Sequence, residues 1–116
     1  MRKPFKKELT SIPLEDAHGG SGKRRLVLSA TDDISKQLEA FANTYLQPGS
    51  KFDWHTHESI DEFLVIISGV GRVLFKDGSV FDYKEKDMIY IPADVEHMIE
   101  AASDQDSEFF FIRVRV

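Results

Sequence analysis

The sequence predicts an all-β domain, a sandwich or closed barrel built from about nine short strands. Short apolar runs recur along the chain, separated by turn-forming residues, and no segment keeps a convincing helical period. The dipeptide Asp77-Gly78 between two such runs is a strong hairpin signal. A chain of 116 residues is long enough for one domain with a single core.

The expected strands follow one another to the end of the chain. Ser and Asp residues separate the first two, and Gln47-Pro48-Gly49 ends the second. The predicted ranges are 24–29, 40–46, 52–57, 62–68, 72–76, 80–83, 88–91, 96–102 and 108–116. Together, residues 23–116 form the expected barrel.

Residues 1–22 are expected to form an N-terminal arm that packs on the barrel or on a partner subunit. Residues 11–14 of this arm are expected to form a short edge strand, because Pro13 cannot donate a hydrogen bond within a central ladder. The glycine-rich connection that follows contains His18, which is expected to be a surface residue.

Composition and charge argue against several classes of protein. The chain has no cysteine, which excludes a disulfide framework and suits a cytoplasmic protein. The longest apolar run, residues 63–67, is far too short to span a membrane. Residues 26–116 carry eight Lys or Arg against seventeen Asp or Glu, and such an acidic barrel argues against binding nucleic acid.

Three of the four histidines fall in two short windows, and an acidic residue lies between them. Neutral imidazole and carboxylate groups bind first-row divalent metals, and alternation along a strand puts His55 and His57 on one side. Glu62 begins an apolar run, where a carboxylate is costly to bury unless it is paired or metal-bound. With His97, these residues indicate a metal site; the alternative is ordinary histidines with a solvent-facing glutamate.

The same residues resemble the two motifs of the cupin superfamily, and the chain resembles its small single-domain cupin 2 type members. The first motif is matched at all its fixed positions, by Gly49, His55, His57, Glu62 and Gly69. The second motif is matched by Pro92 and His97, whereas its two glycines and its final asparagine are replaced by Lys86, Asp94 and Ala101. All four ligand positions of the family are therefore kept.

The resemblance implies a double-stranded β-helix, or jelly-roll, barrel. It also implies one divalent transition metal (Fe, Mn, Ni, Zn or Cu) held by His55, His57, Glu62 and His97. The expected function is that of a metal-dependent enzyme acting on a small organic or sugar-derived substrate, of dioxygenase, isomerase or lyase type. The alternative is a non-catalytic protein that binds or senses a small ligand. No catalytic acid or base is assigned, although Tyr45, Asp53 and Arg113 are conceivable helpers.

Alternation also places side chains around the metal. Leu64 and Ile66 share the face of Glu62, and Ile99 shares that of His97, so these three are expected to line a substrate pocket. On the last strand, Phe111 and Arg113 lie on one face and Ile112 and Val114 on the other. Alternating valine and arginine favours arginines in solvent. If the opposite face points inward, Phe111 and Arg113 join the pocket and Arg113 selects an anionic substrate.

The opposite face of the Glu62 strand is apolar as well, since it carries Phe63, Val65 and Ile67. A strand that is apolar on both faces must be covered on both. We therefore expect a homodimer, with sheet faces or exchanged N-terminal arms at its interface.

Overall fold

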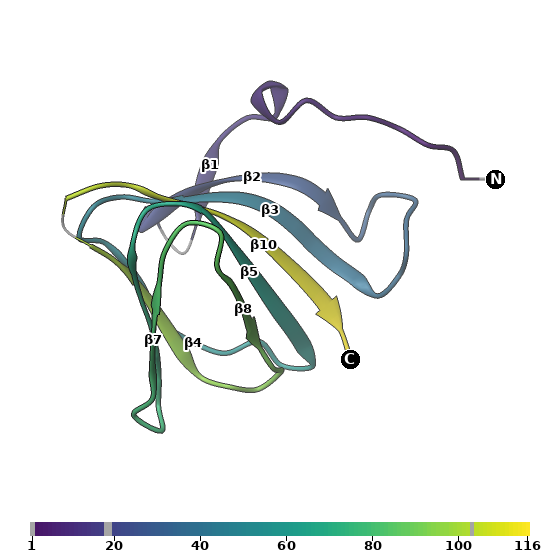
Figure 1. Cartoon of the computed structure of the whole chain (residues 1–116). Helices are drawn as coiled ribbons and strands as arrows, with labels where there is room; N and C mark the ends of the chain where they lie inside the picture. The colour runs from purple at the N-terminus through teal and green to yellow at the C-terminus, as the bar shows by residue number, and fades with distance from the viewer. Residues whose placement is uncertain (1, 18–19, 103) are drawn as a thin grey trace.

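The computed structural model describes residues 2–17, 20–102 and 104–116, which form ten strands and one short 3₁₀ helix (Figure 1). These elements are η1 (Leu9–Ser11), β1 (Glu15–Ala17), β2 (Gly22–Ser29), β3 (Leu38–Leu46), β4 (Lys51–His55), β5 (Ile60–Ser68), β6 (Gly71–Phe75), β7 (Val80–Tyr83), β8 (Met88–Ile91), β9 (His97–Ala101) and β10 (Ser107–Arg115). Within the described residues, no helix has the length and apolar character needed to span a membrane.

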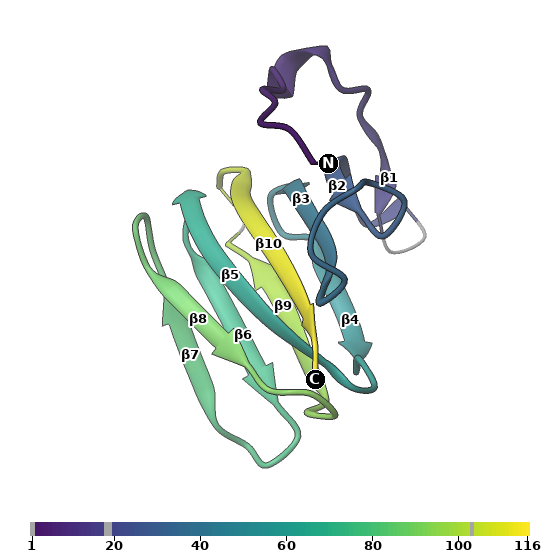
Figure 2. The ribbon, with the colours of Figure 1, turned by 90° about the vertical axis from the view of Figure 1, so that its right-hand side faces the viewer.

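The strands form two antiparallel sheets that face each other (Figure 2). One sheet has six strands in the order β1-β2-β3-β10-β5-β8, and the other has four in the order β4-β9-β6-β7. Strands adjacent in a sheet are mostly distant in sequence, as in a jelly roll. The predicted all-β jelly-roll barrel is therefore confirmed.

The core lies between the two sheets and follows the predicted alternation. On β5, Leu64 and Ile66 are buried on the same face as Glu62, and on β9 Ile99 is buried on the face of His97. The largest fully buried apolar side chains come from both sheets and are Phe52, Phe109, Leu46, Leu64, Ile66, Ile91, Ile99 and Val73.

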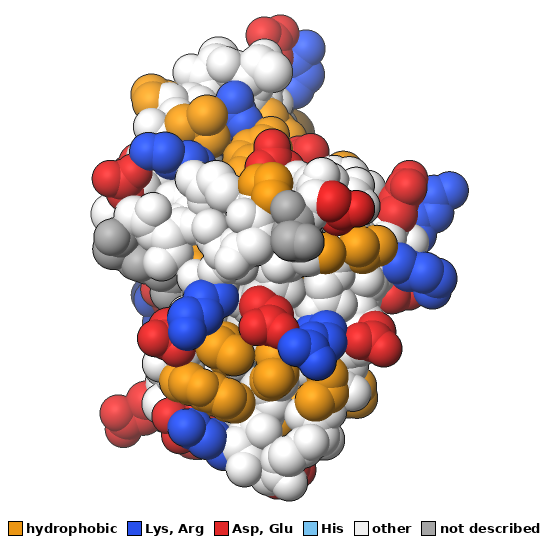
Figure 3. Space-filling model, turned by 90° about the vertical axis from the view of Figure 1, so that its left-hand side faces the viewer, with side chains coloured by type: hydrophobic (Ala, Val, Ile, Leu, Met, Phe, Trp, Pro, Cys, Tyr) orange, Lys and Arg blue, Asp and Glu red, His pale blue; other side chains and the backbone are white. Residues whose placement is uncertain are grey.

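The outer face of the four-stranded sheet carries charges of both signs. Arg72 lies opposite Glu100 on one side and Asp82 on the other, and its guanidinium forms an ion pair with Glu100. The surface in Figure 3 shows such acidic and basic side chains next to one another, beside a group of hydrophobic side chains. Opposite charges on facing strands stabilise the sheet modestly.

The edge strand lies later in the chain than the sequence predicted. Residues 11–14 are not a strand: Ser11 ends the 3₁₀ helix, and Arg25 Nε donates a hydrogen bond to Ile12 O at 3.1 Å. The strand that pairs with β2 is β1, where Glu15 lies opposite Arg24 and Asp16 opposite Lys23. Both pairs form ion pairs. Charge complementarity between residues 15–16 and 23–24 could have predicted this pairing, but the sequence analysis did not use it.

Strand β4 is shorter than predicted, because it ends at His55 and leaves His57 in the following loop. The carbonyl oxygen of His57 accepts a hydrogen bond at 3.1 Å from the backbone N–H of Asp94. Residue 57 is therefore tied to the turn that precedes β9, and not to the neighbouring strand. His57 is therefore not on the predicted strand, but its ligand atom still lies beside that of His55, as the expectation that both point to one side requires.

Two turns retain a conformation that suits glycine although glycine is absent. Lys86 and Asp94, which replace the glycines of the second cupin motif, have φ angles of 73° and 67°. Both lie in the left-handed region, which Asp enters more readily than Lys. The backbone of the motif is thus kept despite the substitutions.

Candidate metal centre

The four residues predicted as ligands lie together at one end of the barrel interior. His55 ends β4, His57 follows in the loop, Glu62 lies near the start of β5, and His97 begins β9. One potential ligand atom from each residue lies within 4.8 Å of those of the other three. The barrel therefore gathers three imidazoles and one carboxylate into a group able to hold a metal ion.

Backbone carbonyls set the orientation of two of the imidazoles. His55 Nδ1 lies 2.6 Å from Asp53 O, and His97 Nδ1 lies 2.9 Å from Val95 O. A carbonyl oxygen only accepts, so Nδ1 carries the proton in each ring and Nε2 keeps its lone pair. This arrangement of a histidine that donates through its other nitrogen is common among metal ligands.

Several polar atoms at this centre are buried without a hydrogen-bond partner. Among the described residues four such side-chain atoms occur, and three of them are His57 Nε2, Glu62 Oε1 and His97 Nε2. Glu62 Oε1 and His97 Nε2 lie 3.4 Å apart, at the long limit of a hydrogen bond. Buried polar atoms in folded proteins nearly always have a partner, and one cation among these three would satisfy them all. The donor set therefore fits a divalent transition metal.

The electrostatics of the centre suit a cation as well. Burial would raise the pKa of Glu62, but the neighbouring His97 and the charge of Arg113 outweigh it and lower that pKa to about 2. Burial lowers the pKa of His57 to about 4, against the opposing attraction of Glu62, and burial likewise lowers the pKa of His55. Near neutral pH, His55 and His57 are therefore neutral and Glu62 is ionised, as metal ligation requires.

Arg113 points into the barrel, so the preference for solvated arginines on the last strand was wrong for this residue, although Arg115 is exposed as expected. Its Nε donates a hydrogen bond to Glu62 Oε2 at 2.9 Å, and its side chain is 18% exposed. Arg113 lies opposite Glu62 in the pairing of β10 with β5, which places both side chains on one face. The alternation of valine and arginine failed as a guide because a buried carboxylate needs a cationic partner.

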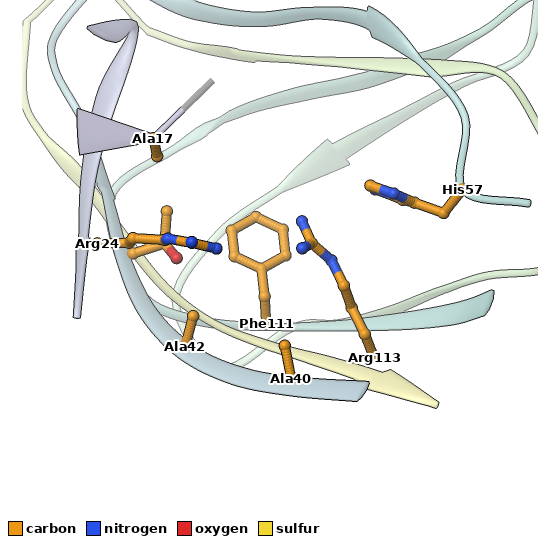
Figure 4. A pocket seen from close by; sticks show the side chains of 8 residues that line it. Ala17, Arg24, Ala40, Ala42, His57, Phe111 and Arg113 are labelled. Atoms are coloured by element: carbon orange, nitrogen blue, oxygen red, sulfur yellow. The ribbon is translucent and has the colours of Figure 1, made fainter. Parts of the chain in front are cut away.

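A cavity of about 250 Å³ opens beside the centre (Figure 4). Its lining comes from β1, β2, β3, β10 and the loop after β4, and consists of Ala17, Arg24, Ala40, Ala42, Thr44, His57, Phe111 and Arg113. Of the residues expected to line a substrate pocket, Phe111 and Arg113 line this cavity. Leu64, Ile66 and Ile99 are instead at most 1% exposed in the hydrophobic core, because the interior beyond the ligands is filled with side chains.

Sequence reasoning missed the lining residues from β1, β2 and β3. On β3, Ala40, Ala42 and Thr44 alternate with larger residues, and their inward side chains leave space above the sheet. Small residues at every second position were the available signal. Arg24 offered no such signal, since its place depends on how β2 pairs with β3.

The other helper candidates lie away from the cavity. The Tyr45 hydroxyl accepts a hydrogen bond from Arg25 Nη1 at 3.0 Å, and Tyr45 is not among the lining residues. The Asp53 side chain is 68% exposed, and only its backbone carbonyl contacts the centre, through His55. His18 lies outside the described residues.

Comparison with known proteins agrees with this geometry. The model of a cupin domain family matches residues 43–113, which include all four candidate ligands. The sequence finds no match among curated proteins.

Solved structures share the fold at low sequence identity. A predicted oxalate decarboxylase from Thermotoga maritima is 23% identical with a TM-score of 0.87, and the alignment covers 97% of this chain and 100% of that one. Ectoine synthase from P. lautus is 14% identical with a TM-score of 0.81, covering 97% of this chain and 78% of the other. The polyketide cyclase RemF from Streptomyces resistomycificus is 15% identical with a TM-score of 0.79, covering 98% and 80%.

Proposed function

The chain belongs to the cupin domain family, and from this premise we propose that it is a mononuclear metal-dependent enzyme acting on a small organic or sugar-derived molecule. The observation that carries the proposal is the set of three buried, unpartnered ligand atoms beside a cavity that reaches His57 and Arg113. His55, His57, Glu62 and His97 would hold one divalent transition metal. When bound, that ion supplies a Lewis acid that polarises an oxygen atom of the substrate.

The protein groups around the ion have separate tasks in this proposal. Arg113 holds Glu62 through Oε2, which leaves Oε1 without a hydrogen-bond partner, 3.4 Å from His97 Nε2. The ring of Phe111 and the methyl groups of Ala40 and Ala42 form an apolar wall that excludes water from one side of the substrate. Strand β10 supports this wall through its pairing with both β3 and β5.

The structural neighbours support a small-molecule substrate and do not choose a reaction. Their names describe a predicted decarboxylase, a synthase and a cyclase, which are three different chemistries on one fold. A fold by itself does not determine the activity. Dioxygenase, isomerase and lyase types therefore remain alternatives, and so do Fe, Mn, Ni, Zn and Cu as the metal.

Metal analysis tests the central part of the proposal. Wild-type protein should contain about one divalent transition metal per chain, and His57→Ala should lose it while keeping the circular dichroism of a folded β protein. His18→Ala is the matched control, because His18 is the histidine that the cupin motifs do not include. Equal metal content in wild type and His57→Ala would contradict the assignment.

A non-catalytic binding or sensing protein is the second candidate, and one observation favours it. The described lining of the cavity has no carboxylate, and apart from the candidate ligand His57 it offers no obvious acid or base for proton transfer. Glu62→Gln separates the two functions. A binder should keep its ligand with weaker affinity, whereas an enzyme should lose most of its kcat in assays of keto acids, catechols and uronates.

We also propose that the protein is a homodimer, joined through sheet faces or exchanged N-terminal arms. The outer face of the six-stranded sheet carries two aromatic pairs, Phe41 with Phe110 and Phe63 with Tyr90, at centroid distances of 5.4 and 5.2 Å. Met88 and Tyr90 are 59% and 45% exposed there. A stable interface should bury more than roughly 1,000 Å² in total. Light scattering that gives a 13.3 kDa particle at micromolar concentration would contradict it.

The cytoplasmic location and the absence of nucleic-acid binding stay predictions.

A further inference from the structure

The cavity beside the candidate metal centre is lined by two arginines and no acidic residue. Arg24 comes from β2 and Arg113 from β10, and Figure 4 shows their guanidinium groups reaching toward the ring of Phe111 from opposite sides. His57 lies on the Arg113 side, so Arg24 marks the end of the cavity that is remote from the candidate metal ligands.

Each arginine uses one nitrogen for a contact within the protein. Arg24 Nε donates to Glu15 Oε1 and Arg113 Nε donates to Glu62 Oε2, both at 2.9 Å. Neither guanidinium shows a hydrogen bond from its terminal nitrogens to any described residue. The terminal nitrogens of a guanidinium group form a planar fork that matches a carboxylate.

Glu15 pairs with Arg24 from outside the cavity. The Glu15 side chain is 51% exposed, on the edge strand β1, and it is not among the lining residues. The Arg24 side chain is only 31% exposed, and it lines the cavity with the small side chain of Ala17 beside it. An arginine directed into a partly buried space is expected to interact strongly with an anion, because solvent screens it less.

We propose that the cavity binds a small dicarboxylate, with one carboxylate at Arg113 next to the metal centre and the second at Arg24. The cavity volume of about 250 Å³ is just below the usual range of ligand pockets, which restricts the ligand to a few carbon atoms. The alanines and Phe111 offer an apolar passage for the chain between the two charged ends. This inference rests on the proposed function, for which it names the substrate class, and Arg24 is the residue that would select for the second charge.

Calorimetric titration of the full-length protein with succinate, and with butanoate as the matched monocarboxylate, tests the proposal. Wild type should bind succinate at least about tenfold more tightly than butanoate, the fold-change expected from one hydrogen-bonded charge pair. Arg24→Gln should remove this preference and leave butanoate binding unchanged. The matched control is Arg72→Gln, since Arg72 also pairs with a glutamate but lies on the outer face of the other sheet. It should bind like wild type.

A second variant checks that the ligand lies in this cavity. Ala42 lies opposite Phe111 in the pairing of β3 with β10, so Ala42→Leu should fill the space and abolish binding of both acids. The proposal is overturned if Arg24→Gln keeps the preference for succinate, if Ala42→Leu binds normally, or if wild type binds succinate no better than butanoate. Metal content is measured on the same samples. Equal metal content in wild type and His57→Ala would contradict the metal-dependent enzyme, whereas an Arg24-dependent preference for succinate in those samples would leave the dicarboxylate site standing.

Discussion

The barrel interior has two halves that treat buried polar groups in opposite ways. In the closed half, the Tyr83 hydroxyl and Ser107 Oγ lie 2.6 Å apart, and both residues are at most 2% exposed. Each satisfies the other. In the half that holds the candidate ligands, His57 Nε2, Glu62 Oε1 and His97 Nε2 are equally buried and have no partner. Buried polar groups serve the fold in the first half and are available for a ligand in the second.

The two halves also differ in packing: side chains fill the closed half, whereas the half with the candidate ligands keeps a cavity. Phe109 contacts Tyr83 in the closed half at a centroid distance of 5.3 Å, and it also contacts Phe111, which lines the cavity, at 5.3 Å. Gly71 is required in the closed half, because a Cβ at this position would collide with the Tyr83 ring and with the carbonyl oxygen of Glu100. The other half keeps a cavity. Strand β5 crosses both, since Glu62 lies in one and Leu64 and Ile66 in the other.

The largest effect is expected in the closed half, from Leu64→Ala. Leu64 is completely buried two residues from Glu62, so its truncation should lower the free energy of unfolding by about 2–5 kcal/mol. Urea denaturation of metal-free protein measures the change. A loss below about 1 kcal/mol would mean that this half is not tightly packed, and the contrast between the halves would fail.

The half that holds the candidate ligands should respond differently when its ion pair between Glu62 and Arg113 is removed. Replacing both Glu62 and Arg113, as Glu62→Leu with Arg113→Met, should leave metal-free protein unchanged or more stable by about 1–4 kcal/mol. The reason is that desolvation of a buried ion pair offsets much of its attraction. Arg113→Met alone is the control and should be destabilising, because it leaves the buried Glu62 carboxylate without its cation. A double variant that is clearly less stable than wild type would show that the pair is kept for stability.

Tyr83→Phe tests whether the closed half depends on the hydrogen bond between the Tyr83 and Ser107 hydroxyls. The substitution leaves the fully buried Ser107 Oγ without its hydrogen-bond partner. It should lower the free energy of unfolding by about 1–2 kcal/mol. Adding Ser107→Ala should recover most of the loss, because both polar groups are then gone. If the double variant is no more stable than Tyr83→Phe, the hydrogen bond is not the cause.

The smallest effect concerns pH. The pKa of His57 is lowered to about 4 in the folded protein from an ordinary value of 6.5, so the unfolded chain takes up a proton first as pH falls. The contribution of His57 to the free energy of unfolding is therefore fully present above pH 6.5 and is lost progressively as pH falls toward 4. When the pH is lowered from 7.5 to 6, the free energy of unfolding of metal-free wild type should fall by up to about 1 kcal/mol more than that of His57→Gln. Identical pH profiles of the two proteins in urea denaturation would contradict the lowered pKa.

Local sequence patterns predicted much of this molecule because they depend on neighbours in the chain. Alternation correctly assigned the buried faces of β5 and β9, and motif spacing identified the four residues that converge at the candidate centre. The same reasoning placed His57 on a strand, although a hydrogen bond from Asp94 holds it in a loop. Alternation also predicted that Arg113 lies in solvent, because a pattern within one strand carries no information about a partner on another strand.

The sequence alone determined the fold class through its local periodicity, and its resemblance to the two cupin motifs indicated the candidate ligand set and the family. The tertiary structure alone decided that Arg113 turns inward to Glu62, 51 positions earlier in the chain, and that Arg24 closes the far end of the cavity. Both outcomes depend on the pairing of β2 with β3 and of β10 with β3 and β5. Register sets the face on which each side chain lies, and it is settled by the closure of the whole barrel.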